Sequence, residues 1–301
     1  MKRIALVIVT FNRCHLLSEM IDSVLKMTLT PEKIFVIDNN SQDDTKKIVD
    51  GFVSKNETLF EYYNTGYNSG GAGGFAIGSK MAVAAGYEYI WMADDDIAFD
   101  KYCLERLVPQ LSQNKITQPM RFNTDGSCAE ISATVYNLSN PFFLRPKRQT
   151  VADIYTESKK KYDIVSIPFE GPVIPAEIFK KIGFPDERFF IFNDDLDFSI
   201  RALKAGFGIE CLADAKIIRK IKFEQSLALK TWKSYFMFRN YFRVQKMYKE
   251  NSLIWLRMYG VLIGAALYQI CTLDLKNLKT LISSFKDGVS KNFNLNEKYK
   301  P

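Results

Sequence analysis

The chain has 301 residues, of which 47% are hydrophobic and 25% charged, and its formal net charge of +7 comes with a composition that excludes collagen-like, low-complexity and wholly disordered proteins. Five scattered cysteines without a CxxC pair argue against a disulfide framework or a zinc site and indicate a reducing compartment, which we take to be the cytoplasm. The single histidine excludes histidine-rich metal sites and a Ser-His-Asp triad unless His15 itself serves, so acid–base chemistry is expected from carboxylates.

Strand-like apolar runs alternate with amphipathic stretches over the first 113 residues. We predict strands at residues 3–10, 33–38, 59–64 and 87–93, and helices at 14–27, 43–52, 74–85 and 101–111. The apolar run at 4–9 is too short for a signal peptide and is interpreted as a buried strand. The alternation is typical of an α/β fold with a doubly wound, mostly parallel sheet flanked by helices, which binds ligands at the carboxyl ends of its strands.

Polar residues follow the first two predicted strands. Asp38 is able to accept hydrogen bonds from a ribose or a base, and Thr10 and Asn12 offer donors and acceptors to the edge of a nucleobase. Asn40 and Ser41 are interpreted instead as ordinary N-cap residues of the following helix.

A glycine-rich run, Asn-Ser-Gly-Gly-Ala-Gly-Gly-Phe at residues 68–75, lies between a predicted strand and a predicted helix. Glycines let backbone N–H groups approach a phosphate or a sugar, and a helix N-terminus favours an anion. The run has neither the lysine of a Walker sequence nor the spacing of a dinucleotide motif. Taken alone, it is as typical of a flexible turn as of a binding loop.

Three consecutive carboxylates, Asp94, Asp95 and Asp96, come directly after the fourth predicted strand. Like charges this close repel one another, so a cation or a helix N-terminus is expected to compensate them. Mg²⁺ or Mn²⁺ held by Asp94 and Asp96 together with phosphate oxygens of a substrate would do so. The alternative is an acidic turn that caps the helix near Lys101.

The middle of the chain is less regular. Residues 114–170 contain several prolines and a basic patch at 145–148, and we expect strands and loops that shape a second subsite. Helices are predicted at 175–182 and 193–206, followed by short strands at 208–212 and 216–221. The second of these helices begins with Asp194, Asp195 and Asp197, which either complement the helix dipole or place one carboxylate where it takes a proton from an acceptor hydroxyl.

The last third of the chain is basic and helical from residue 229 to about 290. Residues 214–301 contain 17 Lys or Arg against 6 Asp or Glu, a net charge of +11, whereas residues 1–213 contain 24 against 28, a net charge of −4. Such a segment suits nucleic acid or an anionic membrane surface. The apolar stretch 253–273 is long enough to span a membrane, but lysines flank both sides, so we favour a buried or interfacial helix.

These motifs, in this order, resemble the inverting glycosyltransferases of family 2, which have a GT-A fold, and in particular the galactofuranosyl- and rhamnosyltransferases of bacterial surface polysaccharides. The likeness covers about residues 3–245. Its segments are 9–13, 38–41, 68–75, 91–96, 194–201 and 235–240. The resemblance implies a catalytic GT-A domain over residues 1–225 and a basic helical region over 226–301 that contacts a membrane surface or another subunit.

The resemblance also implies the site. The nucleotide or donor sugar would be bound by Thr10, Asn12, Arg13, Asp38, Asn68, Gly70, Gly71, Asp94, Asp95 and Arg219. Asp94 and Asp96 would hold Mg²⁺ or Mn²⁺, and Asp195 would be the general base, with Asp194 as the alternative and Asp197 structural. Many relatives have a further histidine ligand in the strand after the base-bearing helix, but residues 215–220 here contain none, so weaker metal binding is expected and Arg219 is a candidate to neutralise the diphosphate directly.

The function implied is transfer of a sugar, with galactofuranose from UDP-galactofuranose as the best candidate, to a hydroxyl of a lipid-linked or polysaccharide acceptor. A rhamnosyltransferase using dTDP-rhamnose, a nucleotidyltransferase and a non-catalytic nucleotide- or membrane-binding protein are the alternatives. The expected partners are the nucleotide sugar, the glycan acceptor and a membrane surface at the inner face of the cell membrane. Self-association stays open, and nucleic acid is not expected as a partner.

Overall fold

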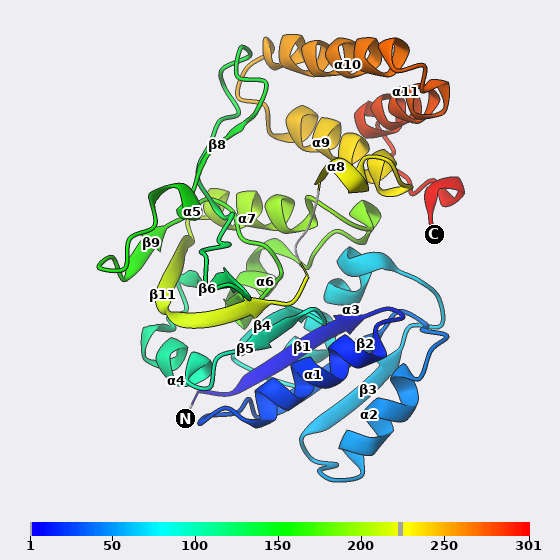
Figure 1. Cartoon of the computed structure of the whole chain (residues 1–301). Helices are drawn as coiled ribbons and strands as arrows, with labels where there is room; N and C mark the ends of the chain where they lie inside the picture. The colour runs from blue at the N-terminus through cyan, green and yellow to red at the C-terminus, as the bar shows by residue number, and fades with distance from the viewer. Residues whose placement is uncertain (1, 222–224) are drawn as a thin grey trace.

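A mixed nine-stranded sheet lies at the centre of the computed structural model, which describes residues 2–221 and 225–301 (Figure 1). The strand order is β3-β2-β1-β4-β10-β6-β11-β5, and β9 pairs with β11. The strands are β1 (Ile4–Thr10), β2 (Lys33–Asp38), β3 (Phe60–Asn64), β4 (Tyr89–Asp94), β5 (Ile97–Phe99), β6 (Lys115–Asn123), β9 (Lys161–Asp163), β10 (Val173–Pro175) and β11 (Gly208–Arg219). The expected α/β sheet flanked by helices is confirmed.

The four predicted N-terminal strands form the parallel half of this sheet. β1 pairs with β2 on one side and with β4 on the other, and β2 pairs with β3. The register places Thr10 opposite Asp38 and Val9 opposite Asp94. The polar residues that end β1, β2 and β4 therefore lie at one edge of the sheet, as expected for parallel strands joined by crossover helices.

The other half of the sheet mixes strand directions. β10 is antiparallel to both β4 and β6, whereas β11 is parallel to β6. The two short strands predicted at 208–212 and 216–221 are a single strand, β11, whose register shifts between Leu212 and Lys216. The irregularity bends the strand, so residues on either side of it read as separate runs in the sequence.

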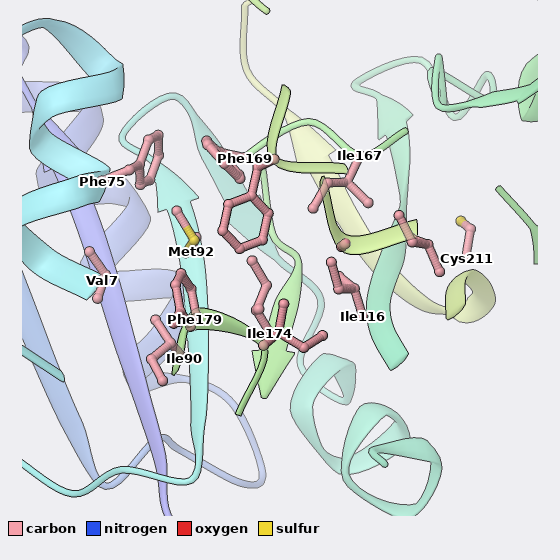
Figure 2. Close-up of a cluster of buried hydrophobic side chains, with 14 of the residues drawn as sticks. Val7, Phe75, Ile90, Met92, Ile116, Ile167, Phe169, Ile174, Phe179 and Cys211 are labelled. Atoms are coloured by element: carbon pink, nitrogen blue, oxygen red, sulfur yellow. The ribbon is translucent and has the colours of Figure 1, made fainter. Parts of the chain in front are cut away.

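Hydrophobic side chains bury β1 on both faces. Ala5, Val7 and Val9 belong to one core cluster, and Ile4, Leu6 and Ile8 belong to another. Figure 2 shows part of the first cluster, with Val7 of β1 and Ile90 and Met92 of β4 packed beside Phe75, Phe169 and Phe179. Each fully buried valine, leucine or isoleucine stabilises the fold by about 1.5–3 kcal/mol. Because both faces of β1 are buried, successive residues are all apolar and the strand is a continuous apolar run in the sequence.

The helices that cover the sheet follow the predicted alternation. In the N-terminal half they are α1 (Cys14–Leu25), α2 (Thr45–Val53), α3 (Gly70–Ala84) and α4 (Cys103–Leu107), and α4 continues into a short 3-10 turn. Beyond them come α5 (Val151–Ile154), α6 (Ala176–Ile182) and α7 (Asp194–Lys204). A separate two-stranded hairpin, β7 (Ala133–Tyr136) and β8 (Lys147–Thr150), projects away from the sheet (Figure 1).

The glycine-rich run is helical rather than a loop, which corrects the predicted start of the helix at residue 74. α3 begins at Gly70, and two of its glycines, Gly74 and Gly78, lie against the sheet. A Cβ on Gly74 would clash with Val9, and one on Gly78 would clash with Val7 and Ile37. These two glycines therefore let the helix lie directly against β1. In the sequence, glycines needed for close packing form the same pattern as glycines of a flexible turn.

The C-terminal part of the chain is helical, as predicted. Its helices are α8 (Gln225–Ala228), α9 (Lys233–Tyr248), α10 (Ile254–Cys271) and α11 (Leu275–Val289). Figure 1 shows α10 and α11 farthest from the sheet, with α9 between them and α7. Phe242, Met258 and Leu281 form the core that joins α9, α10 and α11. The proposed boundary at residue 225 adjoins residues 222–224, which lie outside the described residues, and stays a prediction.

Candidate active site

Thr10 and Arg13, which follow β1, are held against the acidic residues that follow β4. The Thr10 hydroxyl donates to Asp95 Oδ2 at 2.7 Å. Arg13 Nη1 donates to Asp95 Oδ1 at 3.0 Å and to Asp96 Oδ2 at 3.1 Å. Burial raises the pKa of Asp95 to about 6, while Arg13 and the Thr10 hydroxyl oppose that rise. Four of the predicted site residues thus belong to one hydrogen-bonded cluster.

Asp38 and Asn12 are engaged by the loops around them. Asp38 is buried, and its carboxylate accepts from the Tyr62 hydroxyl at 2.6 Å and from the Ser41 backbone N–H at 2.8 Å. Asn12 Oδ1 accepts from the backbone N–H of Gln42, and the Asn12 N–H donates to Ser41 Oγ. Asn40 and Ser41 do not cap α2, because the N-cap of that helix is Asp44, so the capping interpretation was wrong.

The start of α3 is fixed by Asn68 and by Asn39, a residue that the sequence analysis missed. Asn68 Oδ1 accepts from the Gly70 N–H at 2.9 Å, and Asn39 Nδ2 donates to the Gly70 carbonyl at 3.0 Å. Gly70 has φ +71°, and a Cβ there would overlap the backbone of Phe190. Gly71 has open space around its Cα, so it is the glycine at this end of α3 that leaves room for a ligand.

The pKa of Asp94 is raised well above its ordinary value. Burial is the largest cause, and the charges of Asp96, Glu170 and Asp95 raise this pKa further. The pKa of Asp96 is raised by burial and by Glu170, whereas Arg13 and Arg219 lower it. Four carboxylates, the three consecutive aspartates at the end of β4 and Glu170, therefore repel one another in this part of the site.

Glu170 is a site residue that the sequence analysis missed. Glu170 Oε2 pairs with Arg219 Nε at 2.9 Å and with Arg121 Nη1 at 2.9 Å, and Arg121 is itself bound to the buried Glu130. Arg219, predicted to meet the diphosphate, thus lies beside the acidic cluster with Glu170 as its partner. Lys216 and Lys220, the other cations of that stretch, are exposed, and Lys220 pairs with Glu19.

Asp195 lies at the start of α7. Its pKa is raised to about 6, chiefly by burial and also by the charge of Glu170, while the Leu196 N–H, Lys147 and Arg121 oppose the rise. A carboxylate with a pKa just below neutral pH is charged yet able to hold a proton, which suits a general base. Asp194 is buried, and burial and the charge of Asp195 raise its pKa well above the ordinary value.

Asp197 points away from this cluster toward the helices. Its carboxylate accepts from Arg201 Nε at 2.9 Å and from the Tyr248 hydroxyl at 2.5 Å, and it is buried. Tyr248 belongs to α9, so Asp197 joins α7 to the C-terminal helices. These contacts agree with the structural role expected of Asp197.

The loop before α7 has an unusual backbone. Phe190, Phe192 and Asn193 have φ values of 65°, 69° and 63°, a region that costs non-glycine residues free energy. Asn240 of α9 holds this loop, because its Nδ2 donates to the carbonyls of Phe189, Ile191 and Phe192 at 2.8–2.9 Å. The segment 235–240, which carried part of the resemblance, therefore acts on the loop that positions α7.

The described residues contain no cluster of three or more His, Cys, Asp and Glu side chains that could hold a metal ion. Asp94 and Asp96 nevertheless supply hard oxygen ligands in a field of mutual repulsion, which a divalent cation would relieve. Two carboxylates suffice for Mg²⁺ or Mn²⁺ when the substrate phosphates provide further ligands. Asp94 and Asp96 therefore fit such an ion as two protein ligands, and the described residues add no third.

The chain matches Glycosyl transferase family 2 over residues 5–160. It is 30% identical over 213 residues to galactofuranosyltransferase GlfT1 of Mycolicibacterium smegmatis, which covers 66% of this chain and 65% of that protein. It is also 30% identical over 219 residues to GlfT1 of Mycobacterium tuberculosis, covering 69% and 67%. The chain thus aligns with about two thirds of the length of these relatives. The O-antigen chain rhamnosyltransferase RfbN of Salmonella typhimurium is 23% identical over 219 residues, covering 71% and 65%.

Solved structures share the fold. TarS 1–349 of S. aureus superposes with a TM-score of 0.60 at 16% identity, covering 97% of this chain and 82% of that one. GalNAc-T7, solved with UDP, GalNAc and Mn²⁺, has a TM-score of 0.60 at 15% identity and covers 85% and 54%. These structures are GT-A glycosyltransferases. The chain belongs to glycosyltransferase family 2, has the GT-A fold and is a glycosyltransferase, as the ordered motifs predicted.

Proposed function

We propose that this glycosyltransferase transfers galactofuranose from UDP-galactofuranose, with inversion, to a hydroxyl of a lipid-linked or polysaccharide acceptor in bacterial surface glycan synthesis. The observation that carries the proposal is the position of Asp195 at the start of α7, where the charge of Glu170 raises its pKa as it raises those of Asp94 and Asp96. The donor is supported by the 30% identity to galactofuranosyltransferases. A lipid-linked acceptor is supported by a Campylobacter jejuni relative whose name specifies a PP-undecaprenol substrate.

In this proposal Asp195 accepts the proton of the acceptor hydroxyl while that oxygen bonds to the anomeric carbon. The bond from the anomeric carbon to the diphosphate breaks at the same time, and its electron pair leaves with UDP. One base and one displacement invert the anomeric centre. Lys147 keeps Asp195 ionised at neutral pH, because its positive charge lowers the pKa of that carboxyl.

The nucleotide is proposed to bind at the edge of the sheet formed by Thr10, Asn12, Arg13 and Asp38. Gly71 leaves space for the sugar diphosphate beside Asn68, and Arg219 offers a cation next to the acidic cluster. Mg²⁺ or Mn²⁺ held by Asp94 and Asp96 would stabilise the charge that develops on the departing diphosphate. The neighbours solved with Mn²⁺ and a nucleotide or nucleotide sugar support this assignment.

A panel of nucleotide sugars tests the proposal. The purified protein is incubated with Mn²⁺ and UDP-galactofuranose, dTDP-rhamnose, UDP-galactose or UDP-glucose, with and without a polyprenyl-linked acceptor, and release of the nucleoside diphosphate is measured. Acceptor-dependent release from UDP-galactofuranose alone is expected. Preference for dTDP-rhamnose, which the identity to RfbN would favour, would replace the donor assignment.

Asp195→Asn is the matched test of the base. The amide keeps the size of the side chain but accepts no proton, so turnover should fall about 10²- to 10⁴-fold while UDP binding persists. Asp194→Asn is the control, because burial raises the pKa of Asp194 and an amide mimics its neutral form. Full activity of Asp195→Asn together with loss in Asp194→Asn would transfer the assignment to Asp194.

A further inference from the structure

The outer side of α10 is an apolar surface. Among the helices that the structure describes, α10 is the one long and apolar enough to cross a bilayer by length and composition alone. Its residues from 258 to 273 include no charge. The exposed large side chains along it are Leu256, Tyr259, Ile263, Leu267, Tyr268 and Ile270. All of them except Tyr268 are spaced three or four residues apart and lie on one stripe of the helix, where a helix facing water would present charged residues.

The inner side of α10 is anchored to the protein, which argues against a spanning segment. Arg257 is buried, and its guanidinium donates to the Asn137 carbonyl at 2.8 Å and to Gln245 Oε1 at 2.7 Å. Ile254 and Met258 are buried beside it. α10 therefore lies along the molecule with one side packed and one side open, the arrangement of an interfacial helix.

The loop between β7 and β8 extends the apolar surface. Arg257 donates to the Asn140 carbonyl, which ties this loop to α10, and Leu144 lies in contact range of Gly260. The exposed fraction of Phe142 is 84%, and Leu144 is also exposed. At the far end of α10, Leu273 is 83% exposed. We name the α10 face as the set Phe142, Leu144, Leu256, Tyr259, Ile263, Leu267, Ile270 and Leu273.

Exposed cations lie next to the α10 face. Arg145 follows Leu144, and Lys276, Lys279 and Lys286 are exposed on α11. α11 contains one acidic residue, Asp287, which accepts from the Tyr235 hydroxyl. Among the described residues these lysines have no acidic partner. An apolar stripe beside such lysines complements a bilayer with anionic headgroups, because the stripe enters the acyl boundary while the lysines meet phosphate. A second copy of the chain would instead have to bring these lysines close to one another or bury them.

We infer that the α10 face docks on an anionic phospholipid bilayer. The β7–β8 hairpin links the α10 face to the candidate base. Leu144 is three residues before Lys147, about 10 Å of extended chain. The positive charge of Lys147 in turn lowers the pKa of Asp195. Docking through the α10 face therefore brings the membrane surface near the candidate base. This consequence rests on the proposed function: a lipid-anchored acceptor would reach Asp195 without leaving the bilayer. The bilayer would be the anionic inner face of the cell membrane, as expected from the sequence.

Vesicle sedimentation tests the inference without donor or acceptor, so that its failure is separate from a failure of the proposed function. The full chain is mixed with vesicles of phosphatidylcholine alone or of phosphatidylcholine with phosphatidylglycerol. Binding to the anionic vesicles is expected, weakened by high salt. The bound fraction should fall at least about tenfold in Ile263→Asp/Leu267→Asp and in Phe142→Asp/Leu144→Asp, because charged side chains do not enter the acyl boundary.

Leu25→Asp is the matched control, since Leu25 is an exposed leucine on α1 and outside the α10 face. It should bind vesicles like the unaltered chain. Lys276→Glu/Lys279→Glu should lose the preference for anionic lipid. Circular dichroism and UDP binding show that each variant is folded.

Unchanged vesicle binding in both aspartate pairs would overturn the inference. So would absence of binding by the unaltered chain. If sedimentation velocity showed a dimer that Ile263→Asp/Leu267→Asp converts to monomer, without vesicle binding, the occupant of the α10 face would be a second copy and the membrane assignment would be wrong.

Discussion

The side-chain amide of Asn240 donates to the backbone carbonyl of Phe192 at 2.9 Å, two residues before α7 begins. The same amide holds the carbonyls of Phe189 and Ile191. A residue of the C-terminal helices thus fixes the left-handed backbone that leads into the helix of Asp195. These hydrogen bonds join α9 to the loop that leads into α7.

Asn240→Ala should lower kcat about 10- to 100-fold with little change in UDP binding, because release of the loop displaces Asp195 from the acceptor. The three carbonyls left without this donor also cost stability, about 1–3 kcal/mol for each one that stays buried. Gln245→Ala is the control, since Gln245 is a buried amide of the same helix that bonds to Arg257 instead of the loop. Equal loss of kcat in both variants would refute a specific positioning role for Asn240.

Activity should fall as pH decreases through about 6. Burial raises the pKa of Asp195 to about 6, so the carboxylate is ionised above that pH and protonated, hence inactive as a base, below it. Lys147→Ala removes a charge that lowers this pKa, so the acid limb of kcat/KM should move to higher pH. Lys147→Arg should leave the limb in place. A limb at the same pH in Lys147→Ala would show that another group controls it.

Asp94→Asn should stabilise the free protein at pH 7 while impairing metal-supported transfer. Burial and neighbouring carboxylates raise the pKa of Asp94 above its unfolded value, so ionised Asp94 destabilises the fold at neutral pH, and this cost vanishes as the pH falls below the unfolded value. We expect Tm at pH 7 to rise by about 2 °C, as ~1 kcal/mol gives in a chain of this size, and the gain to disappear at acidic pH. A lower Tm at pH 7 would contradict this electrostatic account.

Gly78→Ala should destabilise the protein by about 1–3 kcal/mol, because its Cβ would collide with Val7 and push α3 off β1. Gly51→Ala is the matched control in α2, where a Cβ has no neighbour within 4 Å. That change should stabilise by about 0.5–1 kcal/mol through helix propensity. Urea unfolding measures both, and equal stability of the two variants would contradict the packing explanation for the glycine run.

The sequence was most informative where a local pattern determines the structure. β1, β2 and β4 are continuous apolar runs, so their place in a parallel sheet and the meeting of Thr10, Asp38 and Asp94 at one edge followed from the alternation alone. The glycine run was misread because close packing on Val7 and Val9 leaves the same pattern as a turn. The residues that require glycine at these positions, Val7 and Val9, belong to β1 and lie more than sixty residues earlier in the chain.

Glu170 and Asn39 could not be predicted in the same way. Glu170 is distinguished by its ion pairs with Arg121 of β6 and Arg219 of β11, which lie more than forty residues away on either side in the sequence. Asn39 acts through Ser69 and Gly70, about thirty residues further along. Neither partner is visible in the local sequence, so only the folded chain brings these residues into the site. The roles assigned to individual site residues stay predictions.

The anomeric configuration of the product shows whether the sugar is transferred by a single displacement. The protein is incubated with UDP-galactofuranose and a polyprenyl-linked acceptor, and the new glycosidic bond is examined by proton NMR together with the released nucleotide. One galactofuranosyl residue per UDP released is expected, with the anomeric configuration opposite to that of the donor. Retention of configuration would contradict the single displacement assisted by Asp195, and release of pyrophosphate or UMP in place of UDP would contradict glycosyl transfer itself.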